Sequence, residues 1–288
     1  MPHGTVRVGE IEITALCDMS PQFPATFAEA FPTIPPERHD EIRARYPSAF
    51  DGPDQWVFHD HCFLVRTPSA VVLFDTGIGG PDVLGAQMFG TAGSLPSELD
   101  ASGASAEDVD VVAISHAHLD HIGWNLVRPG DDPSSARPRF PNARYAVQRA
   151  DWEAFASIDD EDDRAAFDQC LRPLEALGAL GLLEGDERLA PGATLRHAPG
   201  HTPGHQVMVL ESARERAVLS GDLANHPAQT ADPTWRTGAD LDPDLAAATR
   251  GRWFDEVEAW NALLCTAHFP EPFGRLRRSH GVRVWSPD

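Results

Sequence analysis

The chain has 288 residues, of which 42% are hydrophobic, so it is long enough and apolar enough to bury a large core. Its formal net charge is −21 and it contains no Lys, which argues against nucleic-acid and membrane partners, because both bind mainly through cationic residues. No apolar run approaches the roughly 20 residues of a membrane span, and no leader-like segment opens the chain, so we expect a cytoplasmic protein.

The first quarter of the chain combines a regular segment with an irregular one. Alternating apolar and polar residues predict a strand or hairpin at 4–17. Residues of about 19–56 carry repeated prolines and phenylalanines, a pattern typical of neither a helix nor a strand. We interpret this Pro/Phe-rich N-terminal excursion as an ordered segment, either a lid or dimer arm over the active site or a flap packed on the core.

Regular elements return after the excursion and alternate between strands and helices. The apolar run DVVAIS at 110–115 is typical of a buried strand, and residues 95–102 are expected to form a helix. The other predicted elements are strands at 56–65, 70–74, 144–148, 194–197, 206–210, 217–219 and 263–267, and helices between 150 and 180 and near 244–262. The acidic run 159–163 is interpreted as a solvated loop, because it lacks the turn glycine of a calcium-binding loop. Together these elements predict one α/β domain with mixed sheets.

Four candidate metal ligands lie within six positions, directly after the predicted strand 110–115. They are His116, His118, Asp120 and His121. In an extended chain, residues two apart point to the same side, so His116 and His118 can face one ion. We expect Asp120 and His121 to begin a helix, and imidazole and carboxylate groups are ligands that Zn²⁺, Mn²⁺ and Fe²⁺ accept.

Three later segments carry further candidate ligands at predicted strand ends. The motif PGHTPGH at 199–205 places His201 in a glycine-framed loop, whereas His205 lies along the next strand and is expected to be a buried structural residue. Asp222 and His268 each follow a predicted strand. The five histidines and two aspartates suffice for two metal ions that share a carboxylate.

The motifs HxHxDH, GHTPGH, SGD and AHF occur in this order between about Val57 and Phe273. This series resembles the metallo-β-lactamase-fold hydrolase superfamily, and DTGIGG and AHFPEPFGRL are most similar to its acyl-homoserine lactonase and methyl parathion hydrolase-like branch. The resemblance implies an αββα sandwich of two mixed β-sheets with helices on the outer faces, in a single domain over residues 1–288. It implies that the first metal takes His116, His118 and His201, that the second takes Asp120, His121 and His268, and that Asp222 bridges them.

The resemblance also implies an activity. It indicates a dinuclear metal-dependent hydrolase that uses a bridging hydroxide to cleave a lactone or other carboxylic ester, with Asp120 moving the proton between the attacking water and the leaving group. The cofactors would be two divalent metal ions, zinc first, with manganese or iron as alternatives. The partners would be a small-molecule substrate and a second copy of the chain in a homodimer.

One departure from the lactonase pattern leaves other functions open. Lactonases of this branch have a tyrosine a few residues after the bridging aspartate, whereas here the candidates near Asp222 are Asn225 and His226. The alternatives are a phosphotriester or aryl-ester hydrolase of the methyl parathion hydrolase type, a thioesterase of the glyoxalase II type, and a mononuclear iron persulfide dioxygenase.

The remaining candidates are expected around the metal ligands rather than on the metals. Asp75, which precedes a glycine-rich turn, is expected to orient a ligand histidine or loop amides. His59 and His61 share one face of a predicted strand and are candidates for the pocket mouth. Phe269 and Phe273 follow His268 and are predicted to form pocket walls.

Overall fold

Two seven-stranded β-sheets form the centre of the computed structural model, which describes residues 4–128 and 135–288. In the first sheet the strand order is β1-β2-β5-β6-β7-β10-β11, antiparallel up to β6 and parallel from β6 onward. Its strands are β1 (Thr5–Val8), β2 (Ile11–Met19), β5 (Asp60–Arg66), β6 (Val71–Phe74), β7 (Val111–Ala113), β10 (Arg144–Gln148) and β11 (Leu180–Leu183).

The second sheet is built from the C-terminal half of the chain. Its order is β12-β13-β14-β15-β16-β17-β18, antiparallel except for the parallel pair β15 and β16. Its strands are β12 (Glu187–Ala190), β13 (Ala193–His197), β14 (Gln206–Ser212), β15 (Glu215–Leu219), β16 (Leu263–Cys265), β17 (Phe273–Ser279) and β18 (Val282–Pro287). Both sheets are therefore mixed, as predicted.

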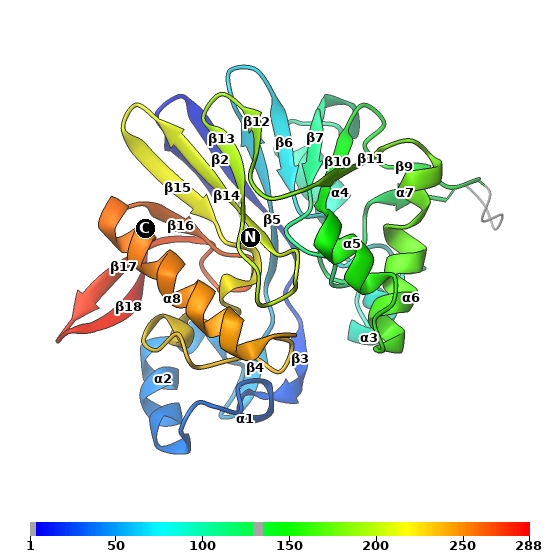
Figure 1. Cartoon of the computed structure of the whole chain (residues 1–288). Helices are drawn as coiled ribbons and strands as arrows, with labels where there is room; N and C mark the ends of the chain where they lie inside the picture. The colour runs from blue at the N-terminus through cyan, green and yellow to red at the C-terminus, as the bar shows by residue number, and fades with distance from the viewer. Residues whose placement is uncertain (1–3, 129–134) are drawn as a thin grey trace.

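Helices cover the outer faces of the two sheets (Figure 1). Those beside the first sheet are α3 (Leu84–Phe89), α4 (Leu95–Ala101), α5 (Arg149–Phe155), α6 (Glu161–Cys170) and α7 (Pro173–Ala176). The long helix α8 (Pro243–Trp260) covers the second sheet, and a short hairpin of β8 (Leu126–Val127) and β9 (Arg137–Pro138) lies apart from both. No helix among the described residues is long and apolar enough to cross a membrane.

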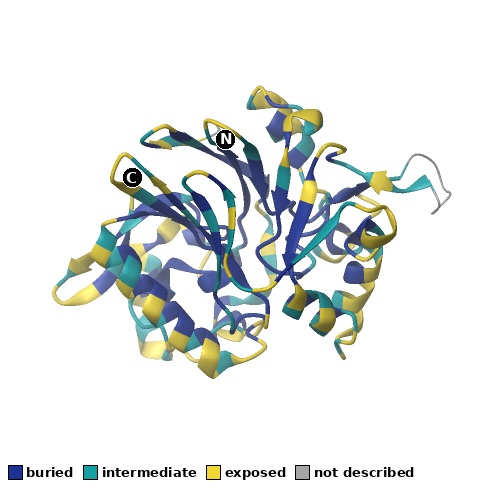
Figure 2. Ribbon diagram, turned by 45° about the horizontal axis from the view of Figure 1, so that its top comes forward, coloured by how far each residue is buried: buried dark blue, intermediate teal, exposed yellow. Residues whose placement is uncertain are grey.

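The alternation of side chains along the strands explains the layered architecture. On β5, Phe63 points to the space between the sheets and Leu64 points to the helices outside. On β15, Leu219 faces the first sheet and Val218 faces α8. Both faces of each sheet are thus apolar, and the strands form the most buried part of the chain (Figure 2). The predicted αββα sandwich is confirmed.

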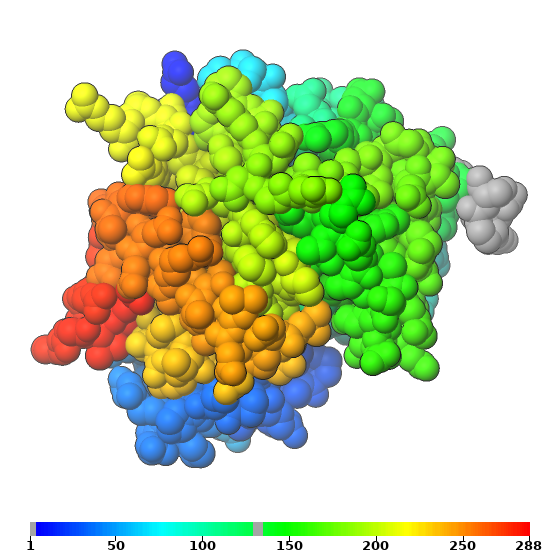
Figure 3. Space-filling model, in the orientation of Figure 1, coloured from blue at the N-terminus to red at the C-terminus, as the bar shows by residue number. Residues whose placement is uncertain are grey.

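The Pro/Phe-rich excursion is an ordered segment that packs on the second half of the chain. It contains β3 (Gln22–Thr26), α1 (Phe27–Ala30), α2 (His39–Arg45) and β4 (Gln55–Val57), besides two short 3₁₀ turns. Its buried side chains include Phe27, Phe31 and Trp56, which belong to the same apolar cluster as α8. In the space-filling view this N-terminal segment lies directly against residues that follow Asp222 (Figure 3). The excursion is therefore part of the core.

Two local predictions are wrong. The predicted strand 56–65 is divided between β4 and β5, which belong to different sheets. The helix expected to begin at Asp120 is absent, and the chain turns there instead. The carbonyl of His121 accepts hydrogen bonds from the backbone N–H and from Oγ1 of Thr76, at 2.9 and 3.1 Å, so it is occupied by a tertiary partner.

Candidate metal centre

The candidate ligands come together because parallel strands end at the same edge of each sheet. In the first sheet β6 and β7 run parallel, so Asp75 and His116 leave the sheet side by side. In the second sheet β15 and β16 run parallel, which brings Asp222 next to His268. His201 lies in the loop between β13 and β14.

Tight backbone turns bring these loops within reach of one another. Gly221, just before Asp222, has φ of +47°, and a Cβ on it would lie 2.8 Å from Nε2 of His205 and from Cβ of Ser115. Asp75 has φ of 64°, a region in which Asp is tolerated better than most residues. Side chains larger than glycine at position 221 would push the two ligand loops apart.

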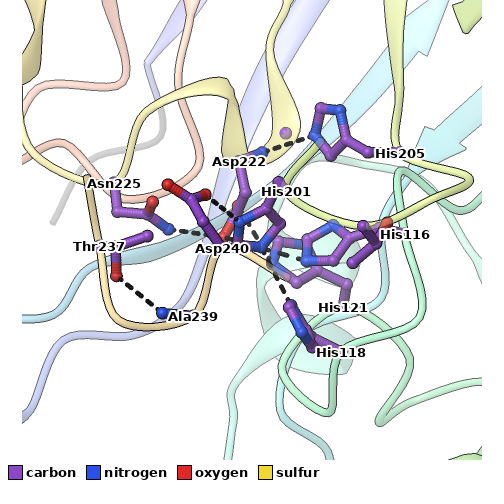
Figure 4. A network of polar contacts seen from close by, with 12 residues as sticks. His116, His118, His121, His201, His205, Asp222, Asn225, Thr237, Ala239 and Asp240 are labelled. Carbon is purple, nitrogen blue, oxygen red and sulfur yellow. Dashed lines mark hydrogen bonds and ion pairs between the residues drawn. The ribbon is translucent and has the colours of Figure 1, made fainter. Parts of the chain in front are cut away.

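Three groups of side chains offer ligand atoms that lie within 4.8 Å of one another. The groups are His116, His118 and His201; His116, His121 and Asp222; and Asp120, His121 and His268. All seven residues predicted as ligands therefore surround one small volume, and four of the imidazole rings point toward it beside Asp222 in Figure 4.

The two oxygens of Asp222 face different histidines. Oδ2 lies 3.4 Å from Nε2 of His201 and 3.9 Å from Nε2 of His116. Oδ1 lies 2.9 Å from Nε2 of His268 and 3.3 Å from Nε2 of His121. A carboxylate placed in this way can serve two ions at once.

Several of the converging atoms lack hydrogen-bond partners although they are buried. They are Nε2 of His116, His121 and His268, and Oδ1 of Asp222. Buried polar groups are nearly always satisfied, so a group of unsatisfied ones aimed at the same point indicates a missing partner. Imidazole nitrogens with carboxylate oxygens form a donor set that suits divalent transition-metal ions, so the residues fit a metal centre.

Two of the candidate ligands are held in the form that metals require. Burial, and then the charge of His121, lower the pKa of His116 well below its ordinary value. Burial also lowers the pKa of His118 to about 3. Both imidazoles are therefore neutral at neutral pH, with a free lone pair for an ion.

The histidines beside the carboxylates behave in the opposite way. Burial alone would lower the pKa of His121, but the carboxylates of Asp120 and Asp222 outweigh it and raise this pKa well above its ordinary value. Burial would also lower the pKa of His268, but the carboxylate of Asp222 outweighs it and raises this pKa above its ordinary value. Without metal, these raised pKa values favour the protonated imidazoles, whose charge offsets that of the carboxylates.

Metal loading is therefore expected to release protons. His121 and His268 must lose a proton to bind an ion, so up to about two protons per chain should leave near pH 7, and apparent metal affinity should rise with pH. Calorimetric titration of zinc into metal-free protein, in two buffers with different ionisation enthalpies, measures this number. His197→Gln, which changes a histidine bonded to the Pro203 carbonyl outside the cluster, is the control. Loading without proton release would contradict the expectation.

Each of four ligand imidazoles has its other ring nitrogen, Nδ1, fixed by a neighbouring group. Nδ1 of His121 donates to Oδ2 of Asp75 at 3.0 Å, and Nδ1 of His268 donates to the His59 carbonyl at 2.7 Å. Nδ1 of His201 donates to Oδ1 of Asp240 at 2.9 Å. The fourth, Nδ1 of His116, lies 2.9 Å from Oγ of Ser115. Such contacts set the tautomer and ring orientation of metal-binding histidines.

His118 is oriented differently from these four. Its Nδ1 lies 3.0 Å from Nε2 of His201, at the centre of the cluster, and its Nε2 lies 3.8 Å from Oδ2 of Asp163. The prediction of a solvated loop at 159–163 is therefore only partly right, because one residue of this run faces the cluster. Asp160 caps α6, and Asp163 approaches the candidate centre.

His205 supports the bridging carboxylate from behind. Its Nδ1 donates to the Ala198 carbonyl at 3.0 Å, and its Nε2 accepts the backbone N–H of Asp222 at 3.0 Å. It is fully buried and both ring nitrogens are satisfied. The predicted buried structural role is confirmed, and in addition this histidine holds the loop that carries Asp222.

Asp151 is a buried carboxylate that the sequence analysis missed, and it joins two loops that carry candidate ligands. Asp151 accepts the backbone N–H of Ala117 at 3.1 Å, Oγ1 of Thr202 at 2.8 Å and the backbone N–H of Gly204 at 2.5 Å. Burial raises the pKa of Asp151 to about 6 against the effect of these bonds. The residue lies in the first turn of α5 beside Arg149, a pattern common in exposed helices.

A cavity of about 330 Å³ opens onto the candidate metal centre. Its lining residues are Phe23, Trp56, Phe58, Phe89, His118, Leu119, Asp120, Asp160, Asp163, Asp222, Asn225, Thr237, Gly238, Ala239 and Leu241. One wall is aromatic, and the described lining includes no Arg. Burial, and then the neighbouring Asp160 carboxylate, raise the pKa of Asp163 to about 7.

Only one of the predicted pocket residues that follow Asp222 and His268 lines this cavity. Asn225 does, and its Nδ2 donates to Oδ2 of Asp222 at 2.6 Å. His226 is buried instead among aromatic rings of the excursion, 4.8 Å from the ring centroid of Phe27. Phe269 packs edge-on against Trp285 in the core, with centroids 5.1 Å apart. The pocket roles predicted for His226 and Phe269 are therefore wrong.

The other predicted pocket residues line a different cavity. His59, His61 and Phe273 border a cavity of about 470 Å³ next to Cys17 and Pro270. The strand β5 begins at Asp60 with both histidines turned away from the candidate centre, and only the His59 carbonyl reaches it, through His268. The prediction that these three residues border the metal pocket is also wrong.

The solved structures similar to this chain cover nearly all of it. A hydrolase named AbOPH, of the beta lactamase superfamily, has a TM-score of 0.81 at 25% identity and covers 99% of this chain and 97% of its own. The dizinc quorum-quenching lactonase AidC, in complex with a product, has a TM-score of 0.79 at 22% identity, with the same coverage. The second likeness concerns the fold alone.

Curated relatives match at the level of sequence. An N-acyl homoserine lactonase of Bacillus thuringiensis is 25% identical over 220 residues, which are 72% of this chain and 80% of that protein. Another, from a Bacillus sp, is 29% identical over 171 residues, and the match spans only 60% of its length.

The family itself is shown by a match over most of the chain. The sequence model of the Metallo-beta-lactamase superfamily matches residues 56–127 and 137–268, which include every candidate ligand. With two mixed sheets, outer helices and a cluster of histidines and aspartates at the sheet edges, the chain belongs to the metallo-β-lactamase superfamily.

Proposed function

We propose that this chain is a dinuclear metal-dependent hydrolase that cleaves a lactone or another carboxylic ester with an apolar acyl part. The observation that carries the proposal is the placement of Asp222, whose two oxygens face two different pairs of histidines at the edge of an aromatic cavity. The names of the relatives, N-acyl homoserine lactonases, favour the same substrate class.

The donor set suits zinc, manganese and iron alike, and the likeness to a dizinc lactonase favours zinc. His116, His118 and His201 would hold one ion, Asp120, His121 and His268 the other, and Asp222 both. When bound, the pair of ions would polarise the scissile carbonyl and lower the pKa of a water molecule toward neutrality.

The protein groups supply binding and proton transfer. The aromatic wall of the cavity, with Phe23, Trp56 and Phe89, offers apolar surface to an acyl chain. Asp120 lines the cavity, and its Oδ2 lies 3.4 Å from Nε2 of His121. Burial would raise the pKa of Asp120, but the neighbouring imidazoles outweigh it and lower this pKa to about 2 in the metal-free protein, so the carboxylate is ionised there. Its place in the cavity supports a role in carrying the proton of the attacking water to the leaving group.

Asn225, like His226, follows Asp222 within the few residues where lactonases of this branch have a tyrosine. Its Nδ2 donates to Asp222, and its buried Oδ1 has no hydrogen-bond partner. This arrangement supports a role in orienting the shared carboxylate. Among the described lining residues there is no tyrosine, so the ester carbonyl would rely on the ions for polarisation.

Two of the alternative functions are less well supported. A thioesterase acting on an anionic thiol conjugate needs a basic site, but Arg277 and Arg278 pair with Asn261 and Glu258, and no Arg appears in the described lining of the cavity. A mononuclear iron dioxygenase needs one ion, whereas two complete ligand groups are present. Elemental analysis separates the one-ion case from the two-ion case.

A substrate panel tests the proposal. The zinc-loaded protein should hydrolyse N-acyl homoserine lactones, with kcat/KM rising as the acyl chain lengthens, because each buried methylene contributes about 0.8 kcal/mol. Aryl esters, thioesters and phosphotriesters are assayed beside them, and the metal-free protein is the blank. Turnover confined to phosphotriesters or thioesters would overturn the lactone assignment and leave the family assignment intact.

A further inference from the structure

Arg250 of α8 is a charged residue that is only 1% exposed. A buried guanidinium must find hydrogen-bond partners for its donors, and this one has several. Nη2 donates to Oδ2 of Asp240 at 3.1 Å, and Nη1 donates to the carbonyls of Pro233 and Trp235 at 2.8 and 3.2 Å. Nε donates to the carbonyl of Leu223, the residue after Asp222.

These partners connect the guanidinium to the candidate metal centre by two routes. Through Asp240 it reaches His201, whose Nδ1 donates to Oδ1 of that carboxylate at 2.9 Å, as seen beside His201 in Figure 4. Through the Leu223 carbonyl it holds the turn that carries Asp222. Both side chains of the Asp240–Arg250 pair are essentially inaccessible, so water does not compete for these bonds.

The same guanidinium holds one wall of the cavity. Residues 233–241 form a loop without regular structure, and four of them line the cavity. Arg250 binds two carbonyls near the start of this loop, and near its end the backbone N–H of Leu241 donates to the His201 carbonyl at 2.9 Å. The guanidinium thus contributes to the orientation of His201 and to the position of the wall, which further bonds such as that from the Gly238 N–H to the Ala30 carbonyl also hold.

We propose that Asp240 and Arg250 are positioning residues that couple ion retention at the His116, His118 and His201 group to the placement of the 233–241 wall. Asp240 keeps Nε2 of His201 aimed at the ion, and Arg250 balances the buried carboxylate and anchors the wall. This inference rests on the proposed two-ion centre, but it makes no assumption about which substrate is cleaved.

The isosteric variant Asp240→Asn tests the first half. It keeps the shape of the side chain but removes the negative charge of the group that accepts a hydrogen bond from Nδ1 of His201. One of the two ions should therefore be retained about 10- to 100-fold less tightly. Chelator competition followed by elemental analysis measures this loss, and anomalous diffraction locates it. The ion should leave the His116, His118 and His201 group and stay at the other.

Asp75→Asn is the matched comparison, because Asp75 contacts His121 in the same way. It should weaken the ion held by Asp120, His121 and His268 and spare the first group. Equal loss of both ions in both variants would show that the substitutions weaken the whole centre without distinction, and it would overturn the assignment of Asp240 to the His116, His118 and His201 group. Wild-type ion retention in Asp240→Asn would also overturn it.

The variant Arg250→Lys tests the second half. A lysine keeps the charge but cannot reach the carbonyls of Leu223, Pro233 and Trp235 together with Asp240. Amide hydrogen exchange at 233–241 should accelerate about tenfold or more, and KM should rise along with ion loss. Arg252→Lys, an exposed arginine of the same helix, is the control. Unchanged exchange in Arg250→Lys would refute the wall anchor.

The two proposals fail separately. If no lactone or ester is hydrolysed but Asp240→Asn still loses the ion at His201, the substrate assignment is wrong and the positioning role stands. If lactones are hydrolysed while both variants behave as wild type in ion retention and exchange, the positioning role is wrong and the proposed function stands.

Discussion

Replacing Asp222 with alanine is expected to reduce bound metal below one ion per chain and to lower hydrolysis by at least about 10³-fold. The reason is geometric, since Oδ2 faces His116 and His201 while Oδ1 faces His121 and His268. Losing this one carboxylate removes a ligand from both groups and leaves the five imidazoles without their shared anion. Elemental analysis and turnover of the best substrate in the panel measure the two effects.

The fold should survive this change. The side chain of Asp222 accepts a hydrogen bond from Nδ2 of Asn225 and pairs with His121 and His268, whereas the neighbouring strands are held by their own ladders. Circular dichroism of the metal-free variant and wild type should therefore agree. Asp244→Ala, at an almost fully exposed side chain that pairs with Arg236, is the control and should keep both ions. An Asp222→Ala protein that retains two ions would contradict the shared-ligand assignment.

The ligand cluster could be predicted from the sequence because its signals are local. His116, His118, Asp120 and His121 lie within one short motif. Of the other three candidate ligands, Asp222 and His268 come shortly after apolar runs, and His201 lies in the glycine-framed motif PGHTPGH. Parallel strands then bring these ends together, which is a property of the sheet and needs no knowledge of individual contacts. The α/β class with mixed sheets is predicted by the alternation of strand-like and helix-like segments, whereas the αββα sandwich is implied by the family resemblance.

The supporting residues could not be predicted in this way. Asp240 lies in an irregular loop and Arg250 lies on a helix, and neither residue belongs to a recognisable motif. The two meet through a tertiary contact. Asp163 lies in an acidic run whose other members are mostly exposed. His226 was placed in the pocket because it is near Asp222 in sequence, but the intervening 3₁₀ turn directs it into the aromatic core.

The C-terminal hairpin was missed for a different reason. Arginines alternate along β17, so its apolar pattern is weak. The turn to β18 is made by His280 and Gly281, whose φ values of 49° and 85° are those of a tight two-residue hairpin turn. A histidine at the first of these positions is not a strong turn signal.

The homodimer and the cytoplasmic location stay predictions.

Phe31→Ala is expected to destabilise the protein by about 3–5 kcal/mol, the usual range for emptying a buried phenylalanine site. Phe31 is fully buried, and its ring centroid lies 4.9 Å from that of Trp56, 5.2 Å from that of Phe27 and 5.5 Å from that of His226. These neighbours come from both the excursion and the segment after Asp222. Urea unfolding, followed by fluorescence and circular dichroism, measures the loss.

The comparison with Phe23→Ala separates the contribution of the segment to core packing from its contribution to the cavity wall. Phe23 belongs to the same segment but is only partly buried and lines the cavity, so its replacement should cost less stability and raise KM for long acyl chains. If the excursion were a lid that detaches, Phe31→Ala would detach it and leave the free energy of unfolding of the remaining fold at the wild-type value. The unfolding curve would then show a separate transition of the excursion at low urea. A single transition shifted to lower urea is expected instead, because the aromatic cluster that includes Phe31 is continuous with the core under α8.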